Sequence, residues 1–168
     1  MRQAMVHAAG KAAGAAGGRP VPASNLHVTL AFLGSVPERR LAALTETARE
    51  SEGAAGHRIE IAFDHLEHWR AAHLLCALPT QPPTPVVALA GRLRDRLVAR
   101  GFAPDLKPFR PHVTVVRKVS PLQRIGEMDA VVWRFTAVAL VESRMLPEGA
   151  LYSVVESFPL CSAKSGGG

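Results

Sequence analysis

The sequence predicts an α+β fold of two similar lobes, each an antiparallel-rich β-sheet with a helix on its outer face. Strand-like runs and helical runs interleave without the regular strand-helix-strand alternation of parallel folds. The tetrapeptide His-Val-Thr-Leu at His27–Leu30 returns as His-Val-Thr-Val at His112–Val115, about half a chain later. One amphipathic helix accompanies each copy. We therefore expect the 168 residues to form one functional unit, with the repeated strands lining a groove between the sheets.

The first half reads as helix, strand and helix. Residues 2–15 are rich in Ala and favour a helix, which the Gly and Pro of residues 17–20 end. An apolar run predicts a strand over Asn25–Leu33. Apolar residues at helical spacing then predict a helix over Pro37–Glu50, behind a capping-box pattern from Ser35 to Glu38.

The rest of the chain is predicted to add five strands and one helix. An amphipathic helix is predicted over Val86–Arg100, with Gly101 just past its end. Asp64–Ala72 is interpreted as a surface loop between two strands. The predicted strands are Arg58–Phe63, His73–Leu78, His112–Val116, Val132–Glu142 and Leu151–Phe158, the last two joined by a turn at Pro147–Gly149. We assign residues 1–160 to one two-lobed domain and expect a disordered tail over 161–168.

The repeated tetrapeptide carries the chemistry. Side chains alternate faces along a strand, so His27 and Thr29 share one face, as do His112 and Thr114. Two imidazoles facing one substrate supply a base and an acid near neutral pH, which in-line displacement at phosphorus requires, and the hydroxyls can hold phosphate oxygens. The alternative is an ancestral duplication whose repeated strand is kept for packing.

The composition of the chain limits which binding partners and which cellular compartment are expected. The chain has a formal charge of +6 and a pI near 10.1, with 16 Arg against 4 Lys, which weakly favours an anionic partner such as nucleic acid. Cys76 and Cys161 show no metal-ligand spacing and are interpreted as free thiols in a reducing compartment. No apolar stretch approaches the roughly 20 residues of a membrane span. We expect a soluble, cytoplasmic protein.

Three further residues, Arg117, Arg110 and Tyr152, are candidates for binding substrate. Arg117, five residues after His112, lies on the opposite face by strict alternation, so a bulge or the end of the strand must turn it toward phosphate. Arg110 could contact a nucleic-acid backbone, although exposed arginines are usually only solvated. Tyr152 could stack on a base, whereas Phe32 falls on the apolar face and is interpreted as packing.

A cluster of ionisable residues raises the question of a metal site. The cluster consists of Asp64, His65, His68 and His73. Its spacing fits no familiar ligand pattern, and we expect no metal and no cofactor.

Two segments resemble the paired signatures of the two-histidine (2H) phosphoesterases, and in particular the RNA 2′,3′-cyclic phosphodiesterases, historically called 2′-5′ RNA ligases. They are Asn25–Gly34 (NLHVTLAFLG) and Phe109–Arg117 (FRPHVTVVR). The resemblance extends to the Ser143–Gly149 turn, Tyr152 and the closing Phe158–Leu160, so it covers roughly residues 20–160.

The resemblance implies metal-free hydrolysis of a terminal 2′,3′-cyclic phosphate on RNA or a nucleotide, leaving a 2′-phosphate. His27 would be the acid that protonates the departing 3′ oxygen and His112 the base that activates water, although a pseudo-symmetric site can exchange these roles. Joining a cyclic end to a 5′-hydroxyl as a 2′-5′ linkage would be the reverse reaction.

The chain departs from the family at its start, where Met1-Arg2 leads directly into a helix and the first apolar strand is missing. We expect a monomer, and an unpaired sheet edge there would favour dimerisation. Adding an upstream strand should raise the melting temperature. Two other functions stay open: hydrolysis of another cyclic or 2′-5′-linked phosphodiester, such as ADP-ribose cyclic phosphate, and non-catalytic binding of RNA ends.

Overall fold

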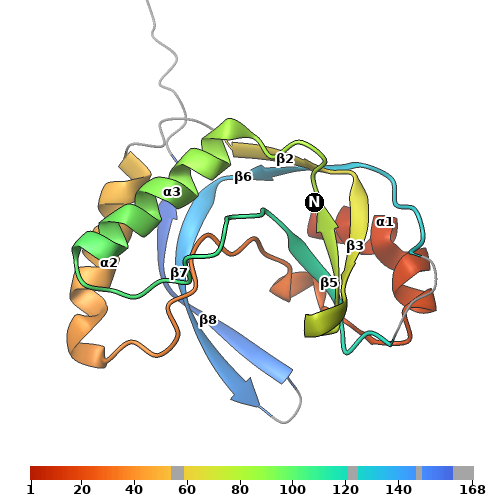
Figure 1. Cartoon of the computed structure of the whole chain (residues 1–168), viewed down its shortest axis with the longest axis horizontal. Coiled ribbons are helices and arrows are strands. Elements are labelled where there is room, and N and C mark those ends of the chain that lie inside the picture. The colour runs from red at the N-terminus through yellow and green to blue at the C-terminus, as the bar shows by residue number, and fades with distance from the viewer. Residues whose placement is uncertain (54–58, 121–124, 147–148, 161–168) are drawn as a thin grey trace, which may run out of the picture. The chain divides into compact units, whose positions relative to one another are not determined.

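The computed structural model describes residues 1–53, 59–120, 125–146 and 149–160 (Figure 1). The chain divides into two compact units. Unit 1 contains Met1–Thr29, Glu60–Pro83 and Arg110–Arg134. Unit 2 contains Leu30–Ile59, Thr84–Phe109 and Phe135–Gly168. Both copies of the His-x-Thr motif therefore lie in unit 1, and the two halves of the sequence are not the two units of the structure.

Unit 1 is built on a four-stranded antiparallel sheet in the order β1-β5-β4-β3. Its strands are β1 (Arg19–Pro20), β3 (His65–Trp69), β4 (Leu74–Leu78) and β5 (Val113–Arg117). Helix α1 (Arg2–Ala15) lies against β5 and buries Met5, Ala9 and Ala12. A Cβ at Gly18 would lie 2.5 Å from the carbonyl oxygen of Arg117, so only glycine lets β1 approach the end of β5.

A second sheet pairs β2 (Ile59–Phe63) with β6 (Val131–Phe135). Apolar and exposed residues alternate in β2, with Ile59, Ile61 and Phe63 buried. The rings of Phe63 and Trp133 meet edge to face at 6.2 Å. Aromatic pairs prefer this arrangement, so the contact adds to the packing of the two strands.

Unit 2 contains α2 (Leu41–Gly53), α3 (Thr84–Ala99) and the hairpin of β7 (Ala137–Leu146) and β8 (Gly149–Pro159). Figure 1 shows α2 and α3 side by side, and their apolar faces supply a core of Leu44, Leu93 and Leu97. Gly101 adopts φ 71° and ends α3 as predicted. The amide of Phe102 donates to the Leu97 carbonyl, which completes a Schellman motif.

The predicted strand over Asn25–Leu33 is wrong. Ala23–Asn25 form a 3₁₀ turn, and residues 26–37 have no regular secondary structure. The apolar residues that suggested a strand are used differently in each unit: Leu26 is buried in unit 1, whereas Leu30 and Leu33 pack on the helical core of unit 2. The face alternation predicted for this segment therefore does not apply.

Three smaller predictions also need correction. The loop predicted over Asp64–Ala72 contains β3, and the reversal into β4 is made by His73 in the left-handed region at φ 53°. The single strand predicted over Val132–Glu142 is divided between β6 and β7. Glu38–Arg40 form a 3₁₀ turn that precedes α2, and no side-chain hydrogen bond caps it, so the capping box is absent.

The remaining strand and helix predictions are confirmed within a few residues. The predicted turn at Pro147–Gly149 lies partly, and the tail 161–168 wholly, outside the described residues. No helix that the structure describes has the length and apolar character needed to cross a membrane. The interpretation of residues 1–160 as one two-lobed domain stays a prediction.

Candidate active site

One face of the four-stranded sheet in unit 1 gathers polar side chains. Residues opposite one another in an antiparallel pair project to the same side, and Glu67 is opposite Cys76, which is opposite Thr114. His65 and Trp69 share the face of Glu67 because they lie two residues away along β3. The other face carries Leu66, Leu75, Ala77 and Val113, all buried. The sheet thus separates a packed side from a side available to a ligand.

A shift in register brings Arg117 to the polar face. Thr114 is opposite Cys76, whereas Val116 is opposite Leu75, so β5 carries one extra residue, Val115, at this point. Such a bulge reverses the alternation beyond it, and Arg117 therefore shares its face with Thr114. In agreement, the positive charge of Arg117 acts to lower the pKa of Cys76. The bulge therefore provides the change of face that the sequence analysis expected for Arg117.

His112 stands immediately before β5 and is held at one edge. Its Nδ1 lies 2.9 Å from the carbonyl oxygen of Arg110. A carbonyl oxygen can only accept a hydrogen bond, so Nδ1 carries the proton. Nε2 is then the nitrogen that can exchange a proton with a ligand. The imidazole also lies against the indole of Trp69, with ring centroids 4.4 Å apart and tilted by 52°.

The surroundings of His112 favour its neutral form. Burial lowers the pKa of His112 below its ordinary value, while the hydrogen bond to the Arg110 carbonyl partly raises it. The positive charges of His27 and Arg110 lower the pKa of His112 further. Unit 1 therefore brings the two histidines within electrostatic reach of each other, although they are far apart in the sequence.

Arg110 ties the segment before His112 to β3. Its guanidinium forms an ion pair with Glu67 and lies 5.6 Å from the centre of the Trp69 ring. Arginine stacks well on an aromatic face because its charge is delocalised over a plane. Glu67 and Trp69, which the sequence assigned to a surface loop, thus position the carbonyl that orients His112.

His27 is held by the same local bond. Its Nδ1 lies 2.6 Å from the carbonyl oxygen of Asn25, two residues before it. The 3₁₀ turn Ala23–Asn25 and the buried Leu26 fix this segment, and Arg2 of α1 donates to the Leu26 carbonyl at 3.2 Å. The ring of His27 is exposed, whereas that of His112 is half-buried.

The two threonines differ in their surroundings. Thr114 lies in the ladder of β5 with its hydroxyl 3.8 Å from the Cys76 sulfur, whereas Thr29 is exposed in the irregular segment. Burial raises the pKa of Cys76 to about 11, so this thiol is protonated at neutral pH and is not an activated nucleophile. Cys76 is free, as predicted; Cys161 lies outside the described residues.

The predicted cluster of Asp64, His65, His68 and His73 does not converge on one point: Asp64 and His65 bond to each other, whereas His73 contacts the Val119 carbonyl. Asp64 accepts hydrogen bonds from the Thr80 amide at 2.9 Å and from the His65 ring at 2.8 Å. These bonds lower the pKa of Asp64, with the His65 contact the largest cause. Among the residues that the structure describes, no three His, Cys, Asp or Glu are grouped so as to hold a metal ion.

Two aromatic candidates lie outside unit 1. Phe32 is 66% exposed, so its predicted packing role is wrong, because the alternation that placed it on an apolar face depended on a strand that does not form. Tyr152 lies in β8 opposite Ser143, half-buried, and its role in base stacking stays a prediction. The sequence missed Trp69 and Glu67, whose signal was the spacing of His65, Glu67 and Trp69 at every second residue.

Comparisons with known proteins agree with the sequence motifs. The family model of the 2′-5′ RNA ligase superfamily matches residues 3–145. The RNA 2′,3′-cyclic phosphodiesterase of Thermus thermophilus is 32% identical over 179 residues, covering 95% of this chain and 84% of that protein. The Escherichia coli protein of the same name is 34% identical over 103 residues, which cover 61% of this chain and 57% of the relative.

Solved structures extend the likeness to the fold. The structure of E. coli LigT complexed with 3′-AMP superposes with a TM-score of 0.84 at 27% identity. The superposition covers 96% of this chain and 91% of that one. The mixed helical and antiparallel architecture predicted from the sequence is therefore confirmed.

Proposed function

Because the chain belongs to the 2′-5′ RNA ligase superfamily, we propose that it hydrolyses 2′,3′-cyclic phosphate ends of RNA or nucleotides to 2′-phosphates. The observation that carries this proposal is the paired restraint of His27 and His112, each with Nδ1 on the carbonyl two residues before it. Relatives named RNA 2′,3′-cyclic phosphodiesterase support the substrate class. Structures of E. coli LigT complexed with 3′-AMP, ATP and phosphate support a phosphate-binding site.

The hydrogen bond from Nδ1 to a backbone carbonyl lets either histidine transfer a proton through Nε2, as a base when neutral and as an acid when protonated. With the Nδ1 proton bound to a carbonyl, the neutral ring presents a lone pair on Nε2 and the cationic ring presents a proton there. The same edge of the ring can therefore accept a proton from water in one copy and donate one to a leaving oxygen in the other. Hydrolysis of a cyclic phosphate needs both steps.

His112 acts as the base and His27 as the acid. Lowering the pKa of His112 keeps its ring neutral at physiological pH, as a base requires. His112 takes a proton from water, which attacks phosphorus as the bond to the 3′ oxygen breaks. The protonated His27 gives its proton to that 3′ oxygen, so the product keeps phosphate on the 2′ position.

Thr29, Thr114 and Arg117 hold the remaining phosphate oxygens. Charge accumulates on these oxygens as water attacks, and donors placed in advance stabilise it. Arg117 is suited to this because the bulge in β5 turns it to the face of Thr114. None of these groups requires a metal ion. RNA as the physiological partner, a cytoplasmic location and a monomeric state stay predictions.

Phosphorus NMR of a cyclic phosphate substrate provides the decisive test. We would incubate the protein in EDTA with a short RNA ending in a 2′,3′-cyclic phosphate and record the phosphorus resonance. The expected result is conversion to a 2′-monophosphate, slowed roughly 10²–10⁴-fold in His27→Ala and His112→Ala. His7→Ala is the matched control, because His7 is an exposed histidine of α1. A cyclic phosphate that persists with wild type would overturn hydrolysis and favour a module that only binds RNA ends.

A further inference from the structure

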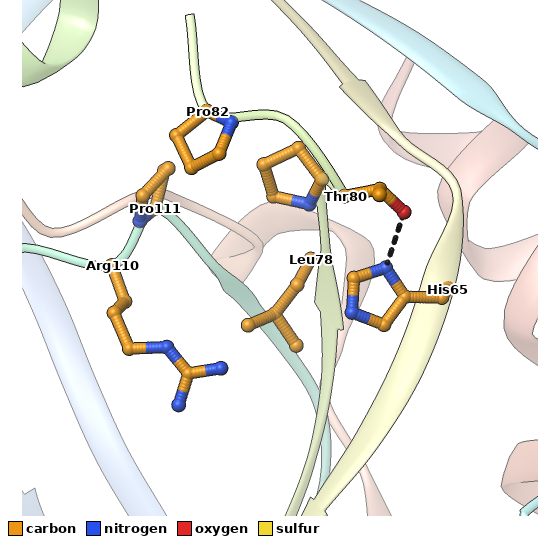
Figure 2. Close-up of a pocket in the computed structure, with 7 residues that line it drawn as sticks. His65, Leu78, Thr80, Pro82, Arg110 and Pro111 are labelled. Atoms are coloured by element: carbon orange, nitrogen blue, oxygen red, sulfur yellow. Dashed lines mark hydrogen bonds between the residues drawn. The ribbon is translucent and has the colours of Figure 1, made fainter.

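A small pocket opens beside the segment that carries His112. Its volume is about 220 Å³, and every residue that lines it belongs to unit 1 (Figure 2). The lining residues are His65, Leu78, Pro79, Thr80, Pro82, Arg110 and Pro111. We propose that this pocket binds the heterocyclic base of the nucleotide whose cyclic phosphate is hydrolysed. The proposal rests on the proposed function and adds the subsite that distinguishes a nucleotide from a bare sugar phosphate.

The walls of the pocket suit a flat, partly apolar ring. Leu78, Pro79 and Pro111 are buried, so their positions are fixed by the fold. Figure 2 shows Leu78 between Arg110 and His65, with the rings of Pro82 and Pro111 above it in this view. Sites for drug-sized ligands occupy roughly 300–1,000 Å³. A pocket below that range is sized for one base rather than for a whole nucleotide.

The charges at the pocket favour a neutral ligand over a second phosphate. The guanidinium of Arg110 is already paired with Glu67, and the ring of His65 already contacts Asp64. Each cationic or titratable donor therefore has a carboxylate beside it. A phosphate would be repelled by these carboxylates, whereas an uncharged base would not.

The same two side chains can still contact a base. The guanidinium plane of Arg110 offers a surface on which an aromatic base can stack, as arginine planes do in RNA recognition. The Thr80 hydroxyl donates to Asp64 at 3.0 Å and its oxygen lies 3.5 Å from Nδ1 of His65, the contact dashed in Figure 2. A hydroxyl oxygen has two lone pairs, so one can still accept a bond from the edge of a base. The pocket thus combines stacking surfaces with a hydrogen-bonding edge.

The position of the pocket fits the reaction geometry. Pro111 lines the pocket and directly precedes His112, and the carbonyl of Arg110 holds the His112 ring. Consecutive Cα atoms are about 3.8 Å apart, so a base seated in the pocket lies within a few ångströms of the backbone of the proposed base catalyst. The ribose attached to that base would then carry its cyclic phosphate toward Nε2 of His112.

Substrates with and without a base test the proposal. We would compare kcat/KM for adenosine and cytidine 2′,3′-cyclic phosphates with that for methyl riboside 2′,3′-cyclic phosphate, which has no base. Base stacking implies a preference of roughly tenfold or more for the nucleotides in wild type. The preference should shrink in Thr80→Trp, which fills the opening, and in His65→Ala, which removes one wall. Gln81→Ala is the control, since Gln81 lies between two lining residues and is not one itself.

The outcomes separate the pocket from the reaction. Equal kcat/KM for all three substrates in wild type, or a preference unchanged in both pocket variants, would overturn the subsite and leave the proposed hydrolysis intact. Absence of hydrolysis of every substrate would overturn the proposed function. In that case the subsite is judged by binding: adenosine 2′-monophosphate should shift the ring proton resonances of His65, and ribose 2-phosphate should not. Equal effects of the two compounds would overturn it.

Discussion

The two His-x-Thr segments have almost the same sequence and different backbones. Val113–Arg117 form β5, in the middle of a sheet, whereas residues 26–37 have no regular structure. Nevertheless both histidines point Nδ1 at the carbonyl two residues earlier, at 2.6 Å for His27 and 2.9 Å for His112. The same bond within three residues therefore orients the ring on two different backbones.

What differs between the copies is the environment of the ring. His112 lies against Trp69 and next to the Arg110–Glu67 ion pair, whereas His27 is exposed. Burial then lowers the pKa of His112. A repeated tetrapeptide supplies two equivalent groups, and the surroundings of His112 are our reason for proposing it as the base. The predictions below test this division of labour.

The largest effect should come from a substrate that needs no acid. If His27 only protonates the 3′ oxygen, a cyclic substrate with sulfur at the bridging 3′ position should restore activity to His27→Ala, because a thiolate leaves without protonation. We expect recovery of most of the roughly 10²–10⁴-fold loss in His27→Ala and little in His112→Ala.

Single-turnover rates on the oxygen and sulfur substrates would measure this recovery. His7→Ala should show the ordinary ratio of the two rates. Recovery in His112→Ala instead would reverse the two roles, and equal recovery in both variants would show that the copies are interchangeable.

Arg117 should have the next largest effect. Replacing it with Gln removes a charged donor from the face of Thr114, and a charge-assisted bond to phosphate contributes about 1.5–3 kcal/mol. We expect kcat/KM to fall roughly 10–100-fold with the melting temperature little changed. Lys118→Gln, which removes the neighbouring exposed charge, should stay within about twofold of wild type. Equal losses in the two variants would indicate general attraction of the anionic substrate rather than a contact made by Arg117.

The sequence predicted the superfamily of this protein better than the backbone of its first motif. Helical spacing located α2 and α3. Helix α3 buries a continuous apolar stripe, whereas α2 buries Leu44 together with Thr47 and Ser51, whose hydroxyls donate to backbone carbonyls one turn earlier. The strand predicted around His27 is wrong because the apolar residues of this segment pack in different units. The spacing of apolar residues along the chain does not show which unit each of them joins. The bulge at Val115 depends on the pairing of β4 with β5, so Arg117 could be assigned a face only from the structure. The contact between Trp69 and His112 joins residues far apart in the sequence and follows from the same pairing.

Trp69 should shift the pH dependence rather than abolish activity. Trp69→Leu removes the ring that shields His112, so the pKa of His112 should rise toward its ordinary value of about 6.5. A base acts in its neutral form, and the acid limb of the kcat/KM profile should therefore move to higher pH. Trp69→Phe keeps an aromatic face and should retain most of the wild-type profile. An acid limb that stays in place in Trp69→Leu would show that the indole does not tune His112.

Cys76 should have the smallest effect, and it tests whether the polar face has a nucleophile of its own. Because burial raises its pKa to about 11, the thiol should resist iodoacetamide at neutral pH while the protein is folded and react once it is unfolded. Cys76→Ser should lower kcat less than about threefold, because the bond to Thr114 can be remade by a hydroxyl. Mass spectrometry of the alkylated peptide distinguishes Cys76 from Cys161. Rapid alkylation of folded Cys76 together with loss of activity would place a reactive thiol beside Thr114 and contradict catalysis by the two histidines alone.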